Sequence, residues 1–253
     1  MTKKFNIQNI NVEPWVDLPS SKFLQNWQRK NEIEFNQKNR QIEKYKMFVK
    51  VFDFLNANGI EGDYFEFGCH RCRTFRMVMS LAYLHFNKKM NFFAFDSFQG
   101  LPKPKNKVSV SHWQKSSLKT TEVQFLKLIK ETGYKTDNVH IIKGFYDKSL
   151  SRDLIKNFKN QDIKCKLVNI DCDLYESAVP VFKFLDSFLI EGSIIYLDDY
   201  YVGNNGNINY GIPRAFEEYK KISNWTFTEH MQVSWWGKTF IASPRIKSNK
   251  KSL

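Results

Sequence analysis

Residues Leu167–Ser177 read LVNIDCDLYES, and this stretch predicts the fold. A short strand-like run, Leu167–Ile170, ends in Asp171-Cys172-Asp173, and a helical pattern follows over Ser177–Leu189. A strand that leads into a helix is typical of a parallel sheet, because parallel neighbours need a long crossover connection. The stretch therefore predicts one unit of an α/β fold.

The same alternation extends to both sides of this stretch. Further strand-like runs lie at Asp63–Phe67, Asn91–Phe95, Val139–Ile142 and Ser193–Leu197. Helical patterns lie at Arg73–Phe86, Glu122–Glu131 and Pro213–Ile222. Two more strands, near Trp225–Glu229 and Thr239–Ala242, are expected to pair like a hairpin. Together these predict a doubly wound, mostly parallel, seven-stranded sheet with helices on both faces.

The N-terminal part of the chain reads as a helix over residues 20–58, and Asn58-Gly59 supplies its stop. Apolar residues recur there at roughly helical spacing: Phe23, Leu24, Trp27, Ile33, Phe35, Ile42, Tyr45, Phe48, Val49, Phe52 and Leu55. The sequence thus divides into a helical extension (1–58), an α/β domain (59–244) and a basic tail (245–253).

Composition excludes several classes of protein. Of 253 residues, 42% are hydrophobic and 16% aromatic, which excludes wholesale disorder. Apolar runs fall short of the ~18 residues that a membrane span needs, and no apolar stretch follows Lys3 and Lys4 as in a secretory signal. Four cysteines in a chain this long do not form a disulfide scaffold, so a reducing cytoplasm is expected.

The net charge of +13 first suggests a nucleic acid or an anionic surface as partner. The positions of the charges along the chain favour a more specific interpretation. Ser97–Thr121 contains no acid, whereas Asp171–Asp199 holds seven acids and one base. The lysines of the first segment are Lys103, Lys105, Lys107, Lys115 and Lys119. Concentrated acids in a basic chain indicate a cation site and leave the basic loop 103–119 for an anionic substrate. The alternative is that these charged residues simply face solvent, and it applies above all to the tail. No nucleic-acid-binding motif is present.

Ligands of doubly wound sheets bind beyond the carboxyl ends of the strands, so the residues there are examined first. The first strand ends in Glu66-Phe67-Gly68 and the second in Asp96-Ser97. An acid in the position of Asp96 is where such folds hold ribose hydroxyls. The G-x-G-x-x-G pattern is not met, because only Gly68 is present, so a nucleoside cofactor without a diphosphate fits better.

Four acids follow two strands that are expected to be neighbours: Asp171, Asp173, Asp198 and Asp199. Four like charges at one edge of a sheet are costly unless a cation compensates them. Carboxylate oxygens without a His/Cys set at ligand spacing suit a hard ion such as Mg²⁺ rather than zinc.

Each of these acids has a structural alternative. Asp173 could cap a helix together with Glu176, but Pro180 would then lie inside that helix at a cost of ~3 kcal/mol. A cap at Ser177 instead leaves the proline in the first turn, which favours a functional role for Asp173. For Asp198 and Asp199 the alternative is a polar strand end at a turn.

Two other patterns are weaker evidence for a functional site. Cys69-x-x-Cys72 could be a redox pair or half of a zinc site, but Cys165 and Cys172 lack the matching spacing, so coincidence is favoured. Of the five histidines, His70 and His112 lie in predicted loops at the sheet edge and stay open as bases or substrate contacts.

Six short sequence blocks, which follow one another in a fixed order, resemble those of a known family. The blocks are Gly62–Gly68 (GDYFEFG), Phe95–Pro102 (FDSFQGLP), Gly144–Leu150 (GFYDKSL), Asp171–Ser177 (DCDLYES), Asp198-Asp199-Tyr200 and Gly211–Ala215. Over about residues 60–220 they resemble the macrocin O-methyltransferase-like family of class I enzymes, which use S-adenosylmethionine (SAM) to methylate sugar hydroxyls. That family implies a Rossmann-like methyltransferase fold and a cytoplasmic enzyme, and many of its members belong to surface-polysaccharide biosynthesis.

Carried over by position, the resemblance implies a role for each strand-end residue. The implied SAM-binding set is Glu66, Gly68, Cys69, Asp96, Ser97, Gly144, Phe145, Tyr146 and Asp171. The implied Mg²⁺ ligands are Asp171, Asp198 and Asp199, with Asp173 as general base and both Asp171 and Asp173 catalytic. Residues 1–58 would help form the substrate pocket and the contacts of a homo-oligomer. One departure is that relatives usually carry glycines where this chain has Cys72 and Arg73, which bears on the SAM pocket.

The acceptor is expected to be a small molecule or glycan, and a nucleotide-linked sugar would suit the basic loop. A catechol also offers two oxygens to Mg²⁺, but catechol-type enzymes usually carry a lysine where this chain has Leu174. Two rivals are weighed against this reading. A non-catalytic basic binding protein would not need all four strand-end acids, and a nucleic-acid methyltransferase would need an N-P-P-Y-type motif that the chain lacks.

Overall fold

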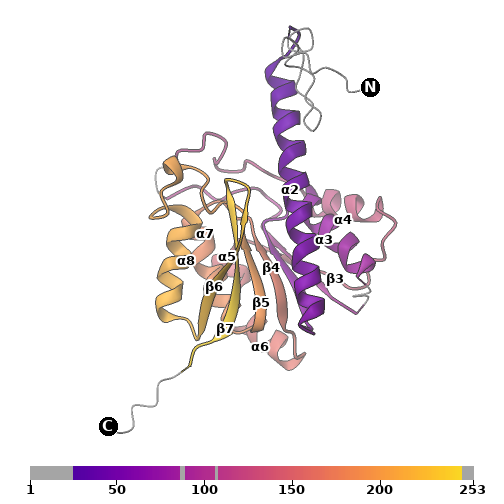
Figure 1. The fold of residues 1–253 in the computed structure, drawn as a ribbon, viewed down its shortest axis with the longest axis vertical. Coiled ribbons are helices and arrows are strands. Elements are labelled where there is room, and N and C mark those ends of the chain that lie inside the picture. The colour runs from indigo at the N-terminus through magenta and orange to yellow at the C-terminus, as the bar shows by residue number, and fades with distance from the viewer. Residues whose placement is uncertain (1–24, 86–88, 106–107, 247–253) are drawn as a thin grey trace, which may run out of the picture. The chain divides into compact units, whose positions relative to one another are not determined.

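The computed structural model describes residues 25–85, 89–105 and 108–246, and its sheet has the predicted number of strands. The strand order is β3-β2-β1-β4-β5-β7-β6. Figure 1 shows the sheet together with its helices. The strands are β1 (Asp63–Phe67), β2 (Phe92–Asp96), β3 (Val139–Lys143), β4 (Cys165–Ile170), β5 (Leu189–Leu197), β6 (Trp225–Val233) and β7 (Gly237–Pro244). The first five are parallel, whereas β7 runs antiparallel between β5 and β6.

Helices and short 3-10 turns connect the strands. They are α2 (Arg29–Ala57), η1 (His70–Cys72), α3 (Arg73–Leu84), α4 (Glu122–Lys130), α5 (Tyr146–Ser149), α6 (Arg152–Asn160), α7 (Tyr175–Leu185), η2 (Asn204–Gly206) and α8 (Gly211–Ile222). The seven predicted strands and the doubly wound α/β class are confirmed.

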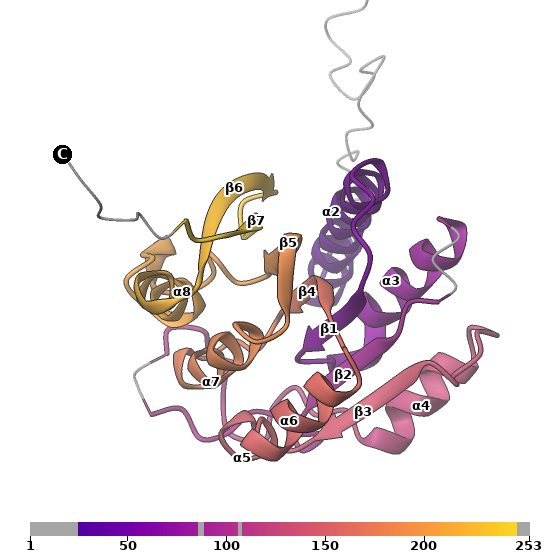
Figure 2. The same cartoon turned by 90° about the horizontal axis from the view of Figure 1, so that it is seen from below.

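Both faces of the sheet are covered, as Figure 2 shows. One hydrophobic cluster joins alternate strand residues such as Phe65 and Val168 to helices α6, α7 and α8. The other joins the intervening residues, such as Tyr64 and Leu167, to α2, α3 and α4. Successive strand side chains point to opposite faces, so a strand buried on both sides must be apolar almost throughout. Strands β1 and β4 are indeed buried at every position.

Several helix predictions need correction. The helix predicted over residues 20–58 begins at Arg29 and ends at Ala57, and the described residues 25–28 lie before it. Helices α5 and α6 were not expected, since α5 has only four residues and α6 is mostly polar. The helix expected at Ser177–Leu189 is α7, which begins at Tyr175 and ends at Leu185, and Leu189 already belongs to β5. Its N-cap is Leu174, so neither Asp173 nor Ser177 caps it, and Pro180 lies inside the helix rather than in its first turn.

The packing of the backbone divides the chain into two compact units, residues 1–43 and 44–253, with the boundary inside the α2 sequence. Within the second unit, α2 buries Lys44, Met47, Phe48, Val51, Phe52 and Leu55. The predicted helix positions 20–24 and Phe86 lie outside the described residues, as do Lys107 and tail residues 247–253. None of the described helices combines the length and the apolar character that crossing a membrane would require.

Candidate active site

The carboxyl ends of β1, β4 and β5 meet at one edge of the sheet. The Asp171 amide donates to the Phe67 carbonyl oxygen at 2.9 Å, and the Asp198 amide donates to the Ile170 carbonyl oxygen at 3.1 Å. Each strand-end acid is therefore fixed against the end of the preceding strand in the sheet. The structure brings the four predicted acids to the same edge.

Three of these acids form a compact cluster. Asp171, Asp173 and Asp199 each contribute one carboxylate oxygen to a group in which all three atoms lie within 4.8 Å of one another. Asp173 and Asp199 are only 8% and 6% exposed. Asp173 has a positive φ of 62°, in a three-residue turn closed by the Leu174 amide on the Cys172 carbonyl oxygen at 2.6 Å. Non-glycine residues in this conformation are strained, and such strain is concentrated at functional sites.

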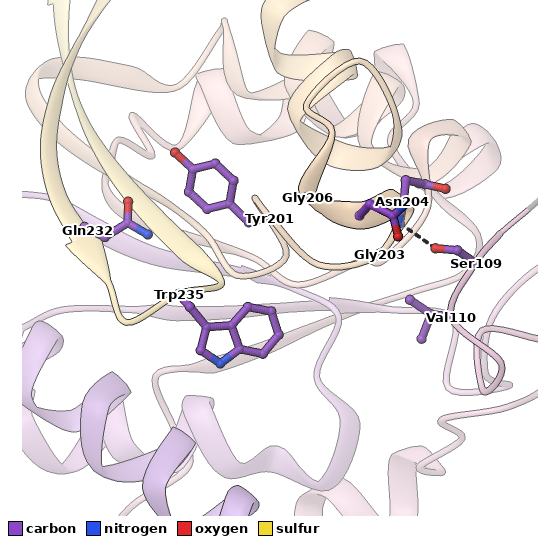
Figure 3. Close-up of a pocket in the computed structure, with 9 residues that line it drawn as sticks. Ser109, Val110, Tyr201, Gly203, Asn204, Gly206, Gln232 and Trp235 are labelled. Atoms are coloured by element: carbon purple, nitrogen blue, oxygen red, sulfur yellow. Dashed lines mark hydrogen bonds between the residues drawn. The ribbon is translucent and has the colours of Figure 1, made fainter.

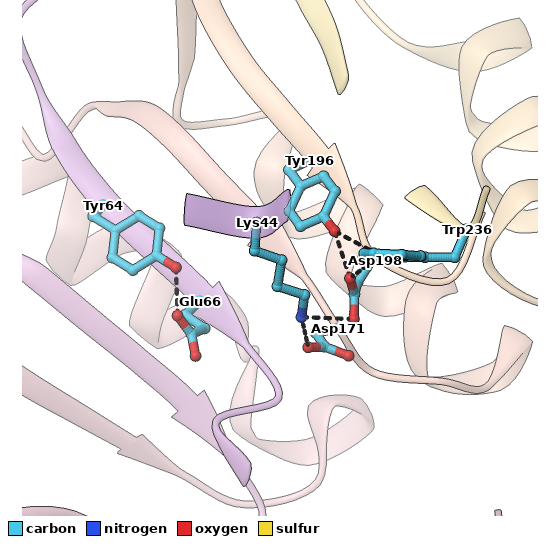
Figure 4. A network of polar contacts seen from close by, with 7 residues as sticks. All are labelled: Lys44, Tyr64, Glu66, Asp171, Tyr196, Asp198 and Trp236. Carbon is cyan, nitrogen blue, oxygen red and sulfur yellow. Dashed lines mark hydrogen bonds and ion pairs between the residues drawn. The ribbon is translucent and has the colours of Figure 1, made fainter. Parts of the chain in front are cut away.

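The fourth acid, Asp198, makes a different set of contacts (Figure 4). Its Oδ2 lies 2.8 Å from the Nζ of Lys44, which also lies 3.2 Å from Oδ2 of Asp171. Its Oδ1 accepts hydrogen bonds from the Tyr196 hydroxyl at 2.5 Å and from the Trp236 indole at 3.1 Å. Lys44 is 5% exposed, so this is a buried lysine shared by two carboxylates.

Lys44 contacts two of the predicted site acids and was not itself predicted as a site residue. It belongs to the buried stripe of α2 that continues through Phe48, Val51 and Leu55. Its spacing from these apolar residues is the helical i, i+4, i+7, i+11 pattern, so a lysine in register with the core was a signal available in the sequence. The predicted apolar pattern of this helix included Ile42 and Tyr45 on either side of Lys44, and these two residues are 41% and 45% exposed.

A buried polar row lies on the same face of the sheet. Glu66, Asn169 and Tyr196 are direct neighbours on β1, β4 and β5, because Glu66 pairs with Asn169 and Asn169 pairs with Tyr196. The Tyr64 hydroxyl donates to Glu66. A carboxyl group, an amide and a hydroxyl on three adjacent strands thus continue into the cluster at the strand ends.

The electrostatics of this edge favour protonated acids in the absence of a cation. Burial, followed by the nearby Asp198 charge, raises the pKa of Asp171 to about 6. Burial and the charges of Asp199, Asp171 and Asp198 raise the pKa of Asp173 well above its usual value. Burial also raises the pKa of Glu66 to about 8. One lysine against this many carboxyl groups leaves the edge short of positive charge.

The other half of the edge, at β1 and β2, is built around one carboxylate. Asp96 Oδ2 accepts from the Cys69 amide and Oδ1 from the Phe98 amide, both at 2.7 Å. The loop after β1 and the loop after β2 are therefore joined through this side chain. Gly68 is required here, because a Cβ would lie 1.9 Å from the carbonyl oxygen of Asp171. Close packing against the end of β4 therefore explains why position 68 is a glycine.

The turn that follows Gly68 keeps a glycine-like backbone without glycine. Arg71 and Cys72 have φ values of 56° and 54°, whereas Arg73 is already helical. The Arg71 amide donates to Thr120 Oγ1 at 2.8 Å, which ties the turn to the segment before α4. Of Cys72 and Arg73, where the resemblance leads us to expect glycines, only Cys72 therefore has a strained backbone.

The remaining predicted cofactor residues also lie near the edge. The Gly144 amide donates to the Asp96 carbonyl oxygen at 2.9 Å, and Phe145 is the N-cap of α5. The Tyr146 hydroxyl donates to the Phe95 carbonyl oxygen at 3.0 Å. Ser97 uses its hydroxyl to close a local turn, donating to the Gly100 carbonyl oxygen at 2.7 Å.

The two candidate histidines contact neighbouring side chains, and the cysteines are buried. His70 Nδ1 lies 3.0 Å from Thr120 Oγ1, and burial together with Arg71 and Arg73 lowers the His70 pKa to about 4. The His112 ring packs edge-on against Trp113. All four cysteines are free and buried, so Cys69 and Cys72 form no disulfide.

One comparison with known proteins identifies the family of this chain. A model of the macrocin-O-methyltransferase (TylF) family matches residues 40–239, which confirms the resemblance drawn from the sequence blocks. A search of curated protein sequences finds no match.

Solved structures show the same fold. The O-methyltransferase NovP superposes with a TM-score of 0.65 at 17% identity, covering 79% of each chain. The calicheamicin methyltransferase CalS11 superposes with a TM-score of 0.61 at 14% identity, covering 92% of this chain and 88% of its own. These likenesses support the class I methyltransferase architecture.

Proposed function

This chain belongs to the macrocin-O-methyltransferase family of SAM-dependent O-methyltransferases, and from that premise we propose that it methylates a sugar hydroxyl in a Mg²⁺-dependent reaction. The observation that carries the proposal is the convergence of Asp171, Asp173 and Asp199 at the sheet edge, next to the turn that joins Asp96 to the end of β1. A cation site and a nucleoside site thus adjoin each other.

The donor set fits Mg²⁺. Hard cations take carboxylate oxygens, and three such oxygens within 4.8 Å can face one ion. Asp171 and Asp199 belong both to this cluster and to the expected ligand set, so we assign them as the core ligands. Asp198 is the expected ligand that is most engaged elsewhere, since Lys44, Tyr196 and Trp236 already bind its carboxylate.

The β1–β2 half of the edge fits SAM. The Asp96 carboxylate is held rigidly by two backbone amides, and each of its oxygens keeps a second lone pair for a ribose hydroxyl. Glu66 and Gly68 lie at the end of β1 on the side of Asp171, where the methionine part would lie. The segment Gly144–Tyr146 follows β3, beside Asp96, where the adenine would lie.

Bound SAM would supply an electrophilic methyl group, and bound Mg²⁺ would lower the pKa of an acceptor hydroxyl. The residues of this chain then have three tasks. Asp171 and Asp199 hold the cation, and Lys44 holds the Asp171 and Asp198 carboxylates in place. Asp173, whose carboxylate lies beside those of Asp171 and Asp199, accepts the acceptor proton on a carboxylate oxygen.

A sugar is favoured over a catechol as acceptor. Leu174 occupies the position of the lysine that catechol-type enzymes use, and it is buried at 1% exposure. One relative by structure, CalS11, is described as a TDP-rhamnose 3'-O-methyltransferase. We therefore place the acceptor among sugars or sugar-bearing precursors, as in polysaccharide biosynthesis. An anionic acceptor bound through the basic loop 103–119, and a homo-oligomer that uses residues 1–58, stay predictions.

Calorimetry with S-adenosylhomocysteine (SAH) tests the proposal, with and without Mg²⁺. We expect SAH binding in wild-type protein and Mg²⁺ binding that Asp199→Asn weakens at least 10-fold without loss of SAH affinity. Asp162→Asn is the matched control, because that side chain is 82% exposed. Failure of the wild-type protein to bind SAH under any condition would reject the assignment.

Asp173→Asn tests the base. Methyl transfer from labelled SAM to TDP-rhamnose and to a set of methyl glycosides is expected to fall by about 10²–10⁴-fold in kcat. Affinities for Mg²⁺ and SAH should stay within twofold of wild type. Loss of Mg²⁺ affinity would make Asp173 a ligand, and unchanged kcat would remove it from proton transfer.

A further inference from the structure

Three segments of the chain form a groove (Figure 3). Ser109 and Val110 come from the loop before α4, Tyr201 and Asn204 from the loop after β5, and Trp235 from the turn between β6 and β7. Its volume is about 740 Å³. The described residues that line it carry no charged side chain, although the chain as a whole has a net charge of +13.

The groove is held in shape by contacts between its loops. The Asn204 amide donates to Ser109 Oγ at 2.5 Å, and the Tyr201 amide donates to the Trp236 carbonyl oxygen at 2.9 Å. Gly203 lets the first two loops meet, because a Cβ there would lie 3.0 Å from Val110 Cγ2. A groove whose walls are joined in this way needs little rearrangement to receive a ligand.

Its position links it to the acid cluster. Tyr201 lies two residues after Asp199, so their Cα atoms are at most about 7 Å apart. Trp235 precedes Trp236, whose indole nitrogen lies 3.1 Å from Asp198 Oδ1. Two walls of the groove are therefore anchored directly on the strand-end acids.

The chemistry of the lining suits a neutral, hydroxyl-rich ligand. Trp235 is 63% exposed and offers a large apolar ring, while Gln232, Asn204 and Ser109 offer amides and a hydroxyl around it. A sugar ring has the complementary surfaces, since its C–H face packs on an aromatic ring and its hydroxyls bind amides. An anionic group in the same place would lose water without gaining a partner of opposite charge.

We propose that this groove binds the sugar ring of the acceptor, with Trp235 as stacking platform and Gln232 and Asn204 as hydroxyl partners. The proposal rests on the proposed function and adds to it the site and the uncharged character of the ring that is bound. Any phosphate of a nucleotide-linked acceptor would then lie outside the groove.

Saturation-transfer NMR tests this with methyl glycosides of rhamnose, glucose, galactose and N-acetylglucosamine as probes. We expect ring-proton signals for at least one of them, reduced at least threefold in Trp235→Ala and at least twofold in Gln232→Ala. Tyr45→Ala is the control, because Tyr45 is another exposed aromatic residue. Methyl glucuronide, the anionic counterpart of the glucoside, should give a weaker signal than the glucoside.

Each outcome decides the matter. Signals that persist in Trp235→Ala, a stronger signal for the glucuronide, or no signal from any probe would overturn the proposal. Every spectrum is recorded with and without SAH, and SAH affinity is measured in each variant. Glycoside binding without SAH binding would reject the methyltransferase assignment and keep the groove, whereas the reverse would reject the groove alone.

Discussion

The two halves of the sheet edge solve the problem of buried charge in different ways. At β1 and β2, Asp96 is satisfied by the amides of Cys69 and Phe98, which are 27 and 2 residues away in sequence. At β4 and β5, four carboxyl groups crowd together, and the nearest cation comes from Lys44, 127 residues from Asp171 and 154 from Asp198.

This difference separates what local sequence builds from what only the complete fold builds. The amides that satisfy Asp96 come from within 27 residues of it, whereas the lysine shared by Asp171 and Asp198 comes from at least 127 residues away. The second half is stable only if a distant helix delivers its lysine. We expect the first half to tolerate change and the second half to be the weak point of the molecule.

The variant Lys44→Met tests this contrast and has the largest expected effect on stability. Removing the lysine leaves the buried Asp198 and the partly exposed Asp171 without their cation, and breaking a buried pair typically costs about 3–5 kcal/mol. Urea unfolding in the presence of a chelator should show a loss of this size. Lys50→Met is the control, because Lys50 is exposed on the same helix. The double variant Lys44→Met/Asp198→Asn should recover part of the loss, and equal effects of Lys44→Met and Lys50→Met would contradict the interpretation.

Glu66→Gln tests the region between the two halves through pH. The folded-state pKa of Glu66 is raised from 4.5 to about 8 by burial, so the native state keeps a proton that the unfolded state releases. The stability this contributes is complete below pH 4.5 and is lost as pH rises through about 8. Glu66→Gln lacks that loss and can still accept from Tyr64.

Melting temperatures between pH 5 and pH 8.5 measure this effect. The glutamine variant should gain several degrees relative to wild type as pH rises, in a series where Glu61→Gln, at an exposed site near β1, follows wild type. A gap between the Glu66→Gln and wild-type curves that stays constant over this range would count against a buried, protonated Glu66.

Arg71→Gly probes the tolerant half and has the smallest effect. Arg71 is exposed and has a φ of 56°, which glycine adopts without strain. Relief of strain minus the greater flexibility of the unfolded chain should stabilise the protein by about 0.5–1 kcal/mol. Calorimetric melting should rise by about 1–4 °C. Arg71→Ala keeps the strain and should show no gain, so equal behaviour of the two variants would argue against strained backbone.

Much of the fold follows from hydrophobic patterning. All seven strands were predicted, and the clearest signals are the apolar runs of strands such as β1 and β4, which are buried at every position. Helix α6 escaped because Leu154, Ile155 and Phe158 are its few apolar residues among charged ones. The end of α7 was misplaced because Phe188 and Leu189 continue its apolar pattern beyond Leu185, with no glycine or proline to mark the turn.

The site was predictable where parallel strands bring their ends together. Asp171, Asp173 and Asp199 were expected at one edge from the positions of their strands alone, and their oxygens do converge. The separate environment of Asp198 was not predictable in this way, since it depends on Trp236 and Lys44 arriving from two other parts of the fold, in addition to Tyr196 two residues earlier in the chain. Side-chain direction at a strand end is decided by such tertiary contacts.

The distance in sequence between Lys44 and its partners also has a consequence for synthesis. At about 5–20 residues per second, a ribosome adds Asp171 roughly 6–25 s after Lys44. For that time the C-terminal part of α2 carries a hydrated ammonium group inside its apolar stripe and has no acid to receive it. This part of the helix can take its final place only once β4 and β5 have been translated. Slowed translation between α2 and β4 would therefore prolong the exposure of Phe48, Phe52 and Leu55, and with it the need for a chaperone.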